Sequence, residues 1–146
     1  MTDAVAGRAL ANGTASGSVL ALSAPLSLWG GVDPATGVIV DPRHPDAGAS
    51  LAGRILALPA ARGSSSSSSV LAELLRAGVG PLGIVLGEQD GILAIGAVVA
   101  RELYGIDCPV VLVAGPAYAR VAAASRIAIG VGGRIELPEA EEVPAT

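Results

Sequence analysis

The chain has 146 residues, and its nine basic residues, all arginine, against 13 acidic ones give a formal net charge of −4. This balance provides no broad positive field for a phosphate backbone or an anionic lipid surface, so we expect neither nucleic acid nor a membrane as partner. Hydrophobic residues make up 51% of the chain but aromatic residues only 2%, which predicts one aliphatic core in a single domain over residues 1–137.

The first half of the chain is rich in strand and turn signals. Two short apolar stretches between residues 7 and 22 flank Asn12-Gly13, a pair that commonly closes a hairpin, so we predict two antiparallel strands there. Beyond this pair the pattern predicts turns at residues 29–37 and 41–45 and strands at residues 38–40 and 54–58.

Strands and helices alternate in the second half. Val70, Leu71, Leu74 and Leu75 fall on one face at helical spacing, which predicts an amphipathic helix after the serines. The remaining elements are expected, in order, as a strand at 84–86, a helix at 91–104, a strand at 110–113, a helix at 117–125, and strands at 127–129 and 134–137. The acidic end, residues 138–146, is expected to fray. Hairpins followed by alternating elements predict an α/β fold of three layers, with a mixed β-layer packed on a second layer and covered by helices.

Two absences point to a cytoplasmic protein that needs a partner for metal chemistry. The longest apolar run, residues 91–100, is far shorter than the roughly 20 residues that cross a bilayer. No compact apolar leader precedes a cleavage site, so we expect the protein in the cytoplasm. Cys108 is the only cysteine, and one thiol cannot hold an iron–sulfur cluster or a structural zinc.

The junction between the buried strand and the amphipathic helix has the strongest functional signal. Arg62 and Gly63 precede six serines; the glycine allows a tight turn, serine hydroxyls cap the new helix, and its free N–H groups attract an anion. The same field favours a serine alkoxide, so Ser64 is the candidate base and Ser65 the reserve. Arg62 suits a substrate carboxylate or phosphate. A flexible serine linker is the alternative, although this run has no second domain to connect.

Other polar residues have simpler structural interpretations. His44 is the only histidine and the only side chain that titrates near neutrality, but it lies in a proline loop. Asp33 precedes a proline, which is a common way to open a turn. For both residues, contact with substrate or with a partner chain remains the alternative. Glu88 and Asp90 precede the helix at 91–104, where capping explains them.

Four segments of the chain resemble the small subunit of aconitase X. They are residues 28–33 (LWGGVD), 41–45 (DPRHP), 62–75 (RGSSSSSSVLAELL) and 87–111 (GEQDGILAIGAVVARELYGIDCPVV). The resemblance implies a swivelling β/β/α domain, similar to the mobile domain of aconitase, that docks on a large subunit. The iron or iron–sulfur centre is then expected on the large subunit, with no cofactor bound by this chain.

The resemblance also implies residue roles and a reaction. The family's base is the serine that follows the glycine, which is Ser64 here, with Arg62, Gly63 and Ser65 as substrate-binding residues; Ala61 stands where archaeal members often have a first glycine. The family's bacterial branch is expected to dehydrate cis-3-hydroxy-L-proline to a pyrroline-2-carboxylate, and the archaeal branch to dehydrate mevalonate 5-phosphate. The serine-rich turn and the Arg-only composition favour hydroxyproline. A non-catalytic swivel module that binds a metabolite or a protein is the alternative of another class.

Overall fold

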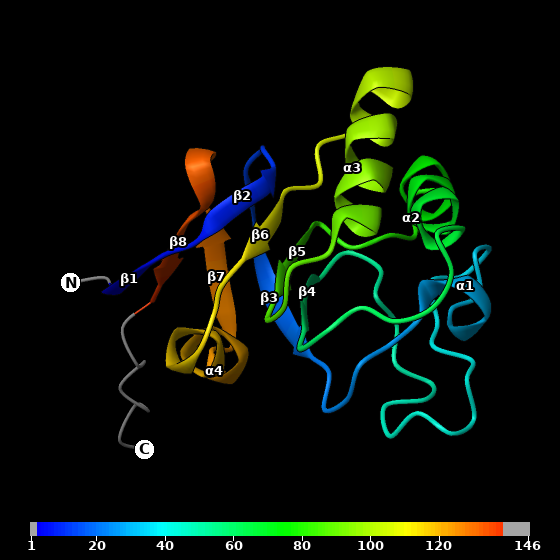
Figure 1. The fold of residues 1–146 in the computed structure, drawn as a ribbon, viewed down its shortest axis with the longest axis horizontal. Coiled ribbons are helices and arrows are strands. Elements are labelled where there is room, and N and C mark those ends of the chain that lie inside the picture. The colour runs from blue at the N-terminus through cyan, green and yellow to red at the C-terminus, as the bar shows by residue number, and fades with distance from the viewer. Residues whose placement is uncertain (1–2, 139–146) are drawn as a thin grey trace, which may run out of the picture.

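The computed structural model describes residues 3–138, whose strands form one mixed sheet covered by helices (Figure 1). The strands are β1 (Asp3–Ala6), β2 (Arg8–Ala11), β3 (Ala15–Ala21), β4 (Ile55–Leu58), β5 (Gly83–Leu86), β6 (Val110–Leu112), β7 (Arg126–Ile129) and β8 (Arg134–Leu137). The helices are α1 (Leu28–Gly31), α2 (Ser67–Arg76), α3 (Gly91–Tyr104) and α4 (Pro116–Ala123), with a 3₁₀ turn, η1 (Val131–Gly133). Apart from Pro138, the acidic end expected to fray lies outside the described residues. No helix in this range is long and apolar enough to cross a bilayer.

Strand β3 connects two sections of the sheet. Its first half pairs antiparallel with β7, beyond which lie β8 and β1. Its second half pairs in parallel with β4, followed by β5 and β6, and β2 closes this section in antiparallel pairing. Only Gly7 separates β1 from β2, and its N–H donates to Gly133 O at 3.0 Å. The two ends of the strand order therefore meet at one place.

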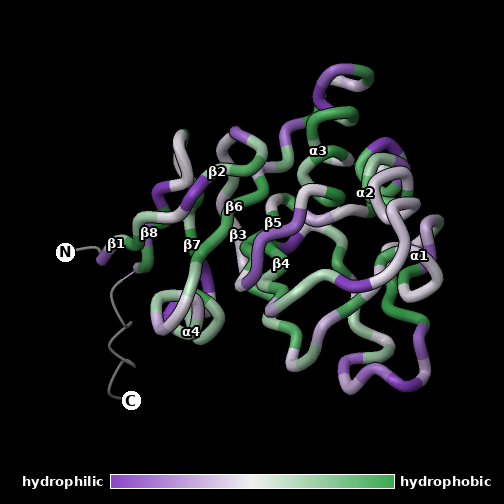
Figure 2. The backbone as a smooth tube through the Cα atoms, in the orientation of Figure 1, coloured by the Kyte–Doolittle hydropathy of each residue, from purple (hydrophilic) through white to green (hydrophobic). Residues whose placement is uncertain are grey.

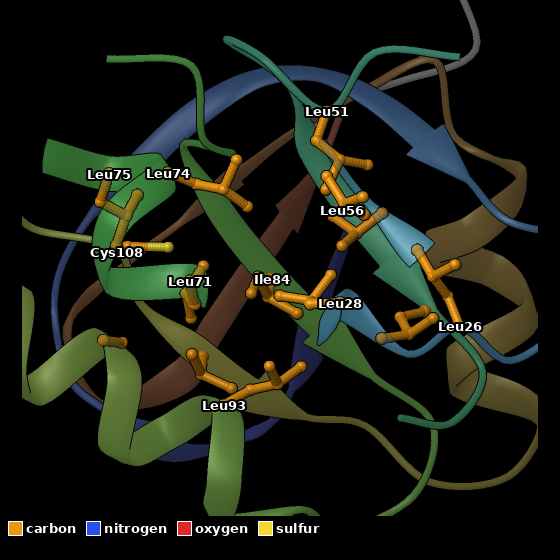
Figure 3. Packing of buried hydrophobic residues seen from close by; sticks show 14 of the residues in the cluster. Leu26, Leu28, Leu51, Leu56, Leu71, Leu74, Leu75, Ile84, Leu93 and Cys108 are labelled. Atoms are coloured by element: carbon orange, nitrogen blue, oxygen red, sulfur yellow. The ribbon is translucent and has the colours of Figure 1, made fainter. Parts of the chain in front are cut away.

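Two hydrophobic clusters separate the three layers. Alternate residues of β4 point to opposite faces, as a strand requires: Ile55 and Ala57 enter the cluster between the two sheet sections, whereas Leu56 and Leu58 enter the cluster under the helices. Figure 3 shows Leu71, Leu74 and Leu93 of the helices directed toward the strand residues in this second cluster. Hydrophobic residues gather on the central strands, whereas hydrophilic residues lie mainly in some of the outer loops (Figure 2). The predicted three-layer β/β/α arrangement is confirmed.

The hairpin predicted around Asn12-Gly13 is wrong. Strand β2 pairs with β6 and β3 pairs with β7 and β4, so the two strands lie in different parts of the sheet. Asn12 provides the physical reason, since its Oδ1 accepts the N–H groups of Gly13 at 3.0 Å and Gly132 at 2.9 Å. These bonds hold the connection against η1 instead of letting it fold back.

The strand expected at residues 38–40 forms only isolated bridges, whereas the other predicted elements are present with small shifts at their ends.

Candidate active site

Two helices begin at the same edge of the sheet. The adjacent parallel strands β4 and β5 lead through residues 59–66 into α2 and through residues 87–90 into α3. Because parallel strands have their carboxyl ends at one edge, the N-termini of α2 and α3 meet there. Gly96 makes close packing possible, since a Cβ at this position would lie 2.5 Å from Ser68 O of α2. The positive N-terminal ends of both helix dipoles therefore point toward the same region of the surface.

A hollow of about 200 Å³ lies at this edge. Its polar lining includes Arg62, Gly63 and Ser64 of the glycine–serine turn, together with Ser67 of α2. Its apolar wall is formed by Leu26, Leu28, Ile92 and Leu93. Three of the predicted site residues are thus brought together beside an apolar wall, which is the usual composition of a small-molecule site.

Gly63 is the residue that fixes the turn. Its φ of +94° lies in the left-handed region, which side chains with a Cβ rarely adopt. A Cβ at this position would also overlap the Oγ and Cβ atoms of Ser27. The Ser27 hydroxyl donates to Trp29 O at 2.8 Å. The turn consequently packs against the segment before α1 with no room for a side chain at residue 63.

The serine run is a hydrogen-bonded turn that continues into a helix, so the linker alternative is wrong. Ser64 Oγ accepts the Ser66 N–H at 3.1 Å, and Ser64 O accepts the Ser67 N–H at 3.0 Å. Ser66 occupies the N-cap position of α2, but its side chain makes no capping hydrogen bond. The serine hydroxyl that accepts a backbone N–H before the helix is that of Ser64, in the preceding turn. Within residues 3–138 the N–H groups of Ser64 and Ser65 have no acceptor. These N–H groups and the fixed Ser64 Oγ form a polar patch suited to negative charge.

Ser67 is a site residue that the sequence interpretation missed. Its side chain is buried, and its Oγ accepts the N–H of Trp29 at 3.2 Å. This bond holds the α1 segment on the first turn of α2, and Trp29 itself is 57% exposed. Helical spacing could have identified it, because Ser67 shares the buried face of α2 with Leu71 and Leu74.

Arg62 and Glu88 face each other across the ends of β4 and β5. Arg62 Nη1 donates to Ala61 O at 3.0 Å and lies 3.6 Å from Glu88 Oε2. Both side chains are more than half exposed. Capping was expected of both acidic residues before α3, but only Asp90 caps the helix, through its Oδ2 and the Leu93 N–H at 2.8 Å. Glu88 is instead the neighbour of the only guanidinium that lines the hollow, within the part of the chain that the structure describes.

The other three candidates, Ser65, Asp33 and His44, do not line the hollow. Asp33 Oδ1 accepts the Ala35 N–H at 2.9 Å and closes the turn that starts there. His44 is buried; its Nδ1 accepts the Asp46 N–H at 3.0 Å, and its Nε2 lies 3.1 Å from Ala24 O. These contacts select the neutral tautomer with the proton on Nε2. Asp33 and His44 therefore have structural partners within this chain.

Residues 3–138 do not provide a set of ligands for a metal centre. No group of three or more His, Cys, Asp or Glu residues that could hold a metal ion exists among residues 3–138. Burial raises the pKa of the Cys108 thiol to about 12, so the thiol stays protonated near neutral pH. A cysteine ligates a metal as the thiolate and not as the thiol.

Comparison with known proteins shows which family this chain resembles. A family model described as the aconitase X swivel domain matches residues 4–137. The cis-3-hydroxy-L-proline dehydratase of Hypocrea jecorina is 41% identical over 140 residues, which cover 94% of this chain and 24% of that protein. The phosphomevalonate dehydratase small subunit of Pyrococcus furiosus is 42% identical over 94 residues, 64% of this chain and 70% of that protein.

The fold agrees with the family model. The crystal structure of Thermococcus kodakaraensis aconitase X in its holo-form aligns with a TM-score of 0.80 and 31% identity, covering 94% of this chain and 99% of that one. The chain spans less than a quarter of the length of the Hypocrea protein, so most of that relative lies outside the matched part. The extent of the family match and the shared fold lead to one conclusion: this chain belongs to the aconitase X swivel domain family.

Proposed function

We propose that this chain is the swivelling subunit of an aconitase X type dehydratase, in which Ser64 is the base that removes a proton from carbon. One observation carries the proposal: Ser64 lines a hollow at the N-termini of two helices, with its Oγ held by the Ser66 N–H. The negative charge that a serine gains as a base is stabilised by these helix ends and by the neighbouring guanidinium of Arg62. The names of the similar dehydratases support the same reaction class.

The proposal requires a second polypeptide. The Pyrococcus relative is named a small subunit, which supports a separate partner chain, whereas in the Hypocrea relative the matched part is 24% of one longer polypeptide. We propose a large subunit that pairs with this chain in the cytoplasm as a heterodimer and holds an iron or iron–sulfur centre. That centre would supply a Lewis acid for the departing hydroxyl.

The residues of this chain bind the substrate and remove the proton. Arg62 holds a substrate carboxylate through its planar guanidinium, and the N–H groups of Ser64 and Ser65 add donors for negative charge. Ionised Ser64 Oγ takes the proton from the carbon next to the carboxylate. The C–O bond then breaks, a double bond forms between the two carbons, and the hydroxyl departs with the C–O electron pair. It becomes water by gaining one proton, equivalent to the proton taken up by Ser64, so that Ser64 is ionised again. The apolar wall that includes Leu28 and Ile92 limits solvent around the developing charge.

The proposed substrate is cis-3-hydroxy-L-proline, which loses water to give a pyrroline-2-carboxylate. Similarity to the Hypocrea relative over 94% of the chain supports this choice. Mevalonate 5-phosphate is the second candidate, supported by the names of the archaeal small subunits. A swivel module without catalysis is the third candidate, and it predicts that no substrate is turned over even when the partner is present.

The experiment is reconstitution of the two-chain complex with single serine variants. We expect the wild-type complex to dehydrate cis-3-hydroxy-L-proline, with the product followed by NMR. Ser64→Ala should lower kcat by about 10²- to 10⁴-fold, the usual contribution of a positioned base. Ser65→Ala, the matched control in the same turn, should retain most of the activity. Unchanged turnover in Ser64→Ala would exclude Ser64 as the base. Failure of a folded wild-type complex to turn over either cis-3-hydroxy-L-proline or mevalonate 5-phosphate would favour the non-catalytic module.

A further inference from the structure

A cation that lines the hollow is paired with an anion that does not itself line it. The cation is Arg62, which lines the hollow, and the anion is Glu88, whose Oε2 lies 3.6 Å from Arg62 Nη1. Asp90 also lines the hollow, but its carboxylate accepts the Leu93 N–H at 2.8 Å and is committed to the helix cap. Among the charged side chains of residues 3–138 near the hollow, Glu88 is thus the anion available to a ligand.

The contact between these two residues is easily exchanged. The side chain of Arg62 is 58% exposed and that of Glu88 is 68% exposed, and ion pairs between solvent-exposed groups contribute only about 0 to 1 kcal/mol. Their distance of 3.6 Å exceeds that of a direct charge-assisted hydrogen bond. A ligand that offers a carboxylate to Arg62 and a cation to Glu88 can therefore replace the pair at little cost.

We propose that Glu88 determines substrate class by binding the ammonium group of a zwitterionic amino or imino acid, while Arg62 binds its carboxylate. This inference rests on the proposed function and deepens it. In such an acid the nitrogen and the carboxylate are attached to the same carbon, so its two charges are adjacent, as are those of Arg62 and Glu88. Binding at both charges presents the hydrogen on that carbon to the neighbouring Ser64.

The same arrangement disfavours a phosphate ester. Mevalonate 5-phosphate carries a carboxylate and a phosphate but no cation, and Arg62 is the only guanidinium of the described chain that lines the hollow. Glu88 would then face a second negative charge with no group to pair with, and like charges at close range raise the energy of the bound state. Glu88 accordingly favours the zwitterion and acts against the phosphate ester.

Two ligands that differ in one atom of the ring test this role. L-proline has the ammonium, and (S)-tetrahydrofuran-2-carboxylate has an oxygen in its place and is purely anionic. Calorimetry on the two-chain complex measures the Kd of each ligand for the wild type, for Glu88→Gln and for Glu136→Gln. Glu136 is an exposed residue of β8 and does not line the hollow, so its variant removes the same charge away from the site.

For Glu88→Gln we expect the Kd of L-proline to rise about tenfold, the effect of losing one charge-assisted contact in a site that a partner shields. The Kd of (S)-tetrahydrofuran-2-carboxylate should stay the same or fall, because the Glu88 carboxylate no longer competes with the ligand for Arg62. Glu136→Gln should change neither value. Equal changes for both ligands, an unchanged Kd for L-proline, or no binding of L-proline to the wild-type complex would each overturn the role of Glu88. A complex that binds L-proline through Glu88 but never dehydrates hydroxyproline would refute the proposed function and leave this inference standing.

Discussion

Replacement of Gly63 by alanine tests how strictly the turn before Ser64 is built. Alanine at a φ of +94° costs about 1 to 3 kcal/mol of backbone strain. Its Cβ would also displace the Ser27 hydroxyl from Trp29 O, and a lost hydrogen bond costs about 0.5 to 1.5 kcal/mol. Together we expect a loss of about 1.5 to 4.5 kcal/mol in the free energy of unfolding. For a domain of this length that corresponds to a Tm lower by about 5 to 15 °C.

Gly48 provides a matched control for this experiment. Its φ is +93°, almost the same as that of Gly63, but a Cβ there would meet no atom within 4 Å. Gly48→Ala therefore measures the backbone strain alone, by urea unfolding followed with circular dichroism, and Gly63→Ala should cost about 0.5 to 1.5 kcal/mol more. Ser27→Gly should cost about 0.5 to 1.5 kcal/mol in the wild type but little in the Gly63→Ala background, where the hydrogen bond of Ser27 to Trp29 O is already lost. Equal losses for the two alanine variants would refute the close packing of the turn on Ser27.

Three further substitutions address the surroundings of the site. Ser67→Ala should lower the free energy of unfolding by about 1 to 2 kcal/mol, because it removes the acceptor of the Trp29 N–H. Ser69→Ala, at an exposed position in the same turn of α2, should leave the free energy of unfolding unchanged. Equal effects of the two variants would contradict the role of the buried hydroxyl. Gly96→Ala should lower the free energy of unfolding, measured by urea titration, by about 1 to 2 kcal/mol because α2 and α3 must separate. Gly91→Ala, where a Cβ would meet no atom within 4 Å, should leave it unchanged. A Gly96→Ala variant more stable than the wild type would contradict the close approach of the two helices. Tyr118→Phe should stabilise by up to about 1 kcal/mol because its buried hydroxyl has no partner among the described residues. Burial raises the pKa of Tyr118 to about 12, so only the unfolded tyrosine ionises between pH 10 and 12, and the advantage of Phe should grow in that range; a destabilised variant would contradict this account.

The part of the fold that holds the candidate site could be predicted from the sequence because it depends on local signals. A buried strand, a glycine–serine turn and an amphipathic helix follow one another between residues 54 and 76. A second strand and helix follow between residues 83 and 104, and the parallel pairing of β4 and β5 brings both helix starts together. Each step uses the periodicity of short segments, which the amino-acid pattern records directly.

The errors concern contacts between distant segments. Asn12-Gly13 has the composition of a hairpin turn, but its side-chain bond to Gly132, 120 residues away, decides where the chain goes. The place of Ser67 under Trp29 and the pairing of Arg62 with Glu88 likewise depend on segments 38 and 26 residues apart. Such contacts follow from the assembled sheet, so local propensity cannot identify them.

Exchange of the substrate's carbon-bound hydrogen with solvent tests most directly whether Ser64 is the base. In D₂O, the complex of this chain with its large subunit should introduce deuterium at the carbon next to the carboxylate of cis-3-hydroxy-L-proline, and this step reports proton removal separately from departure of the hydroxyl. We expect Ser64→Ala to abolish the exchange and Ser65→Ala to retain it. Exchange at the wild-type rate in Ser64→Ala would contradict the assignment of the base to this chain.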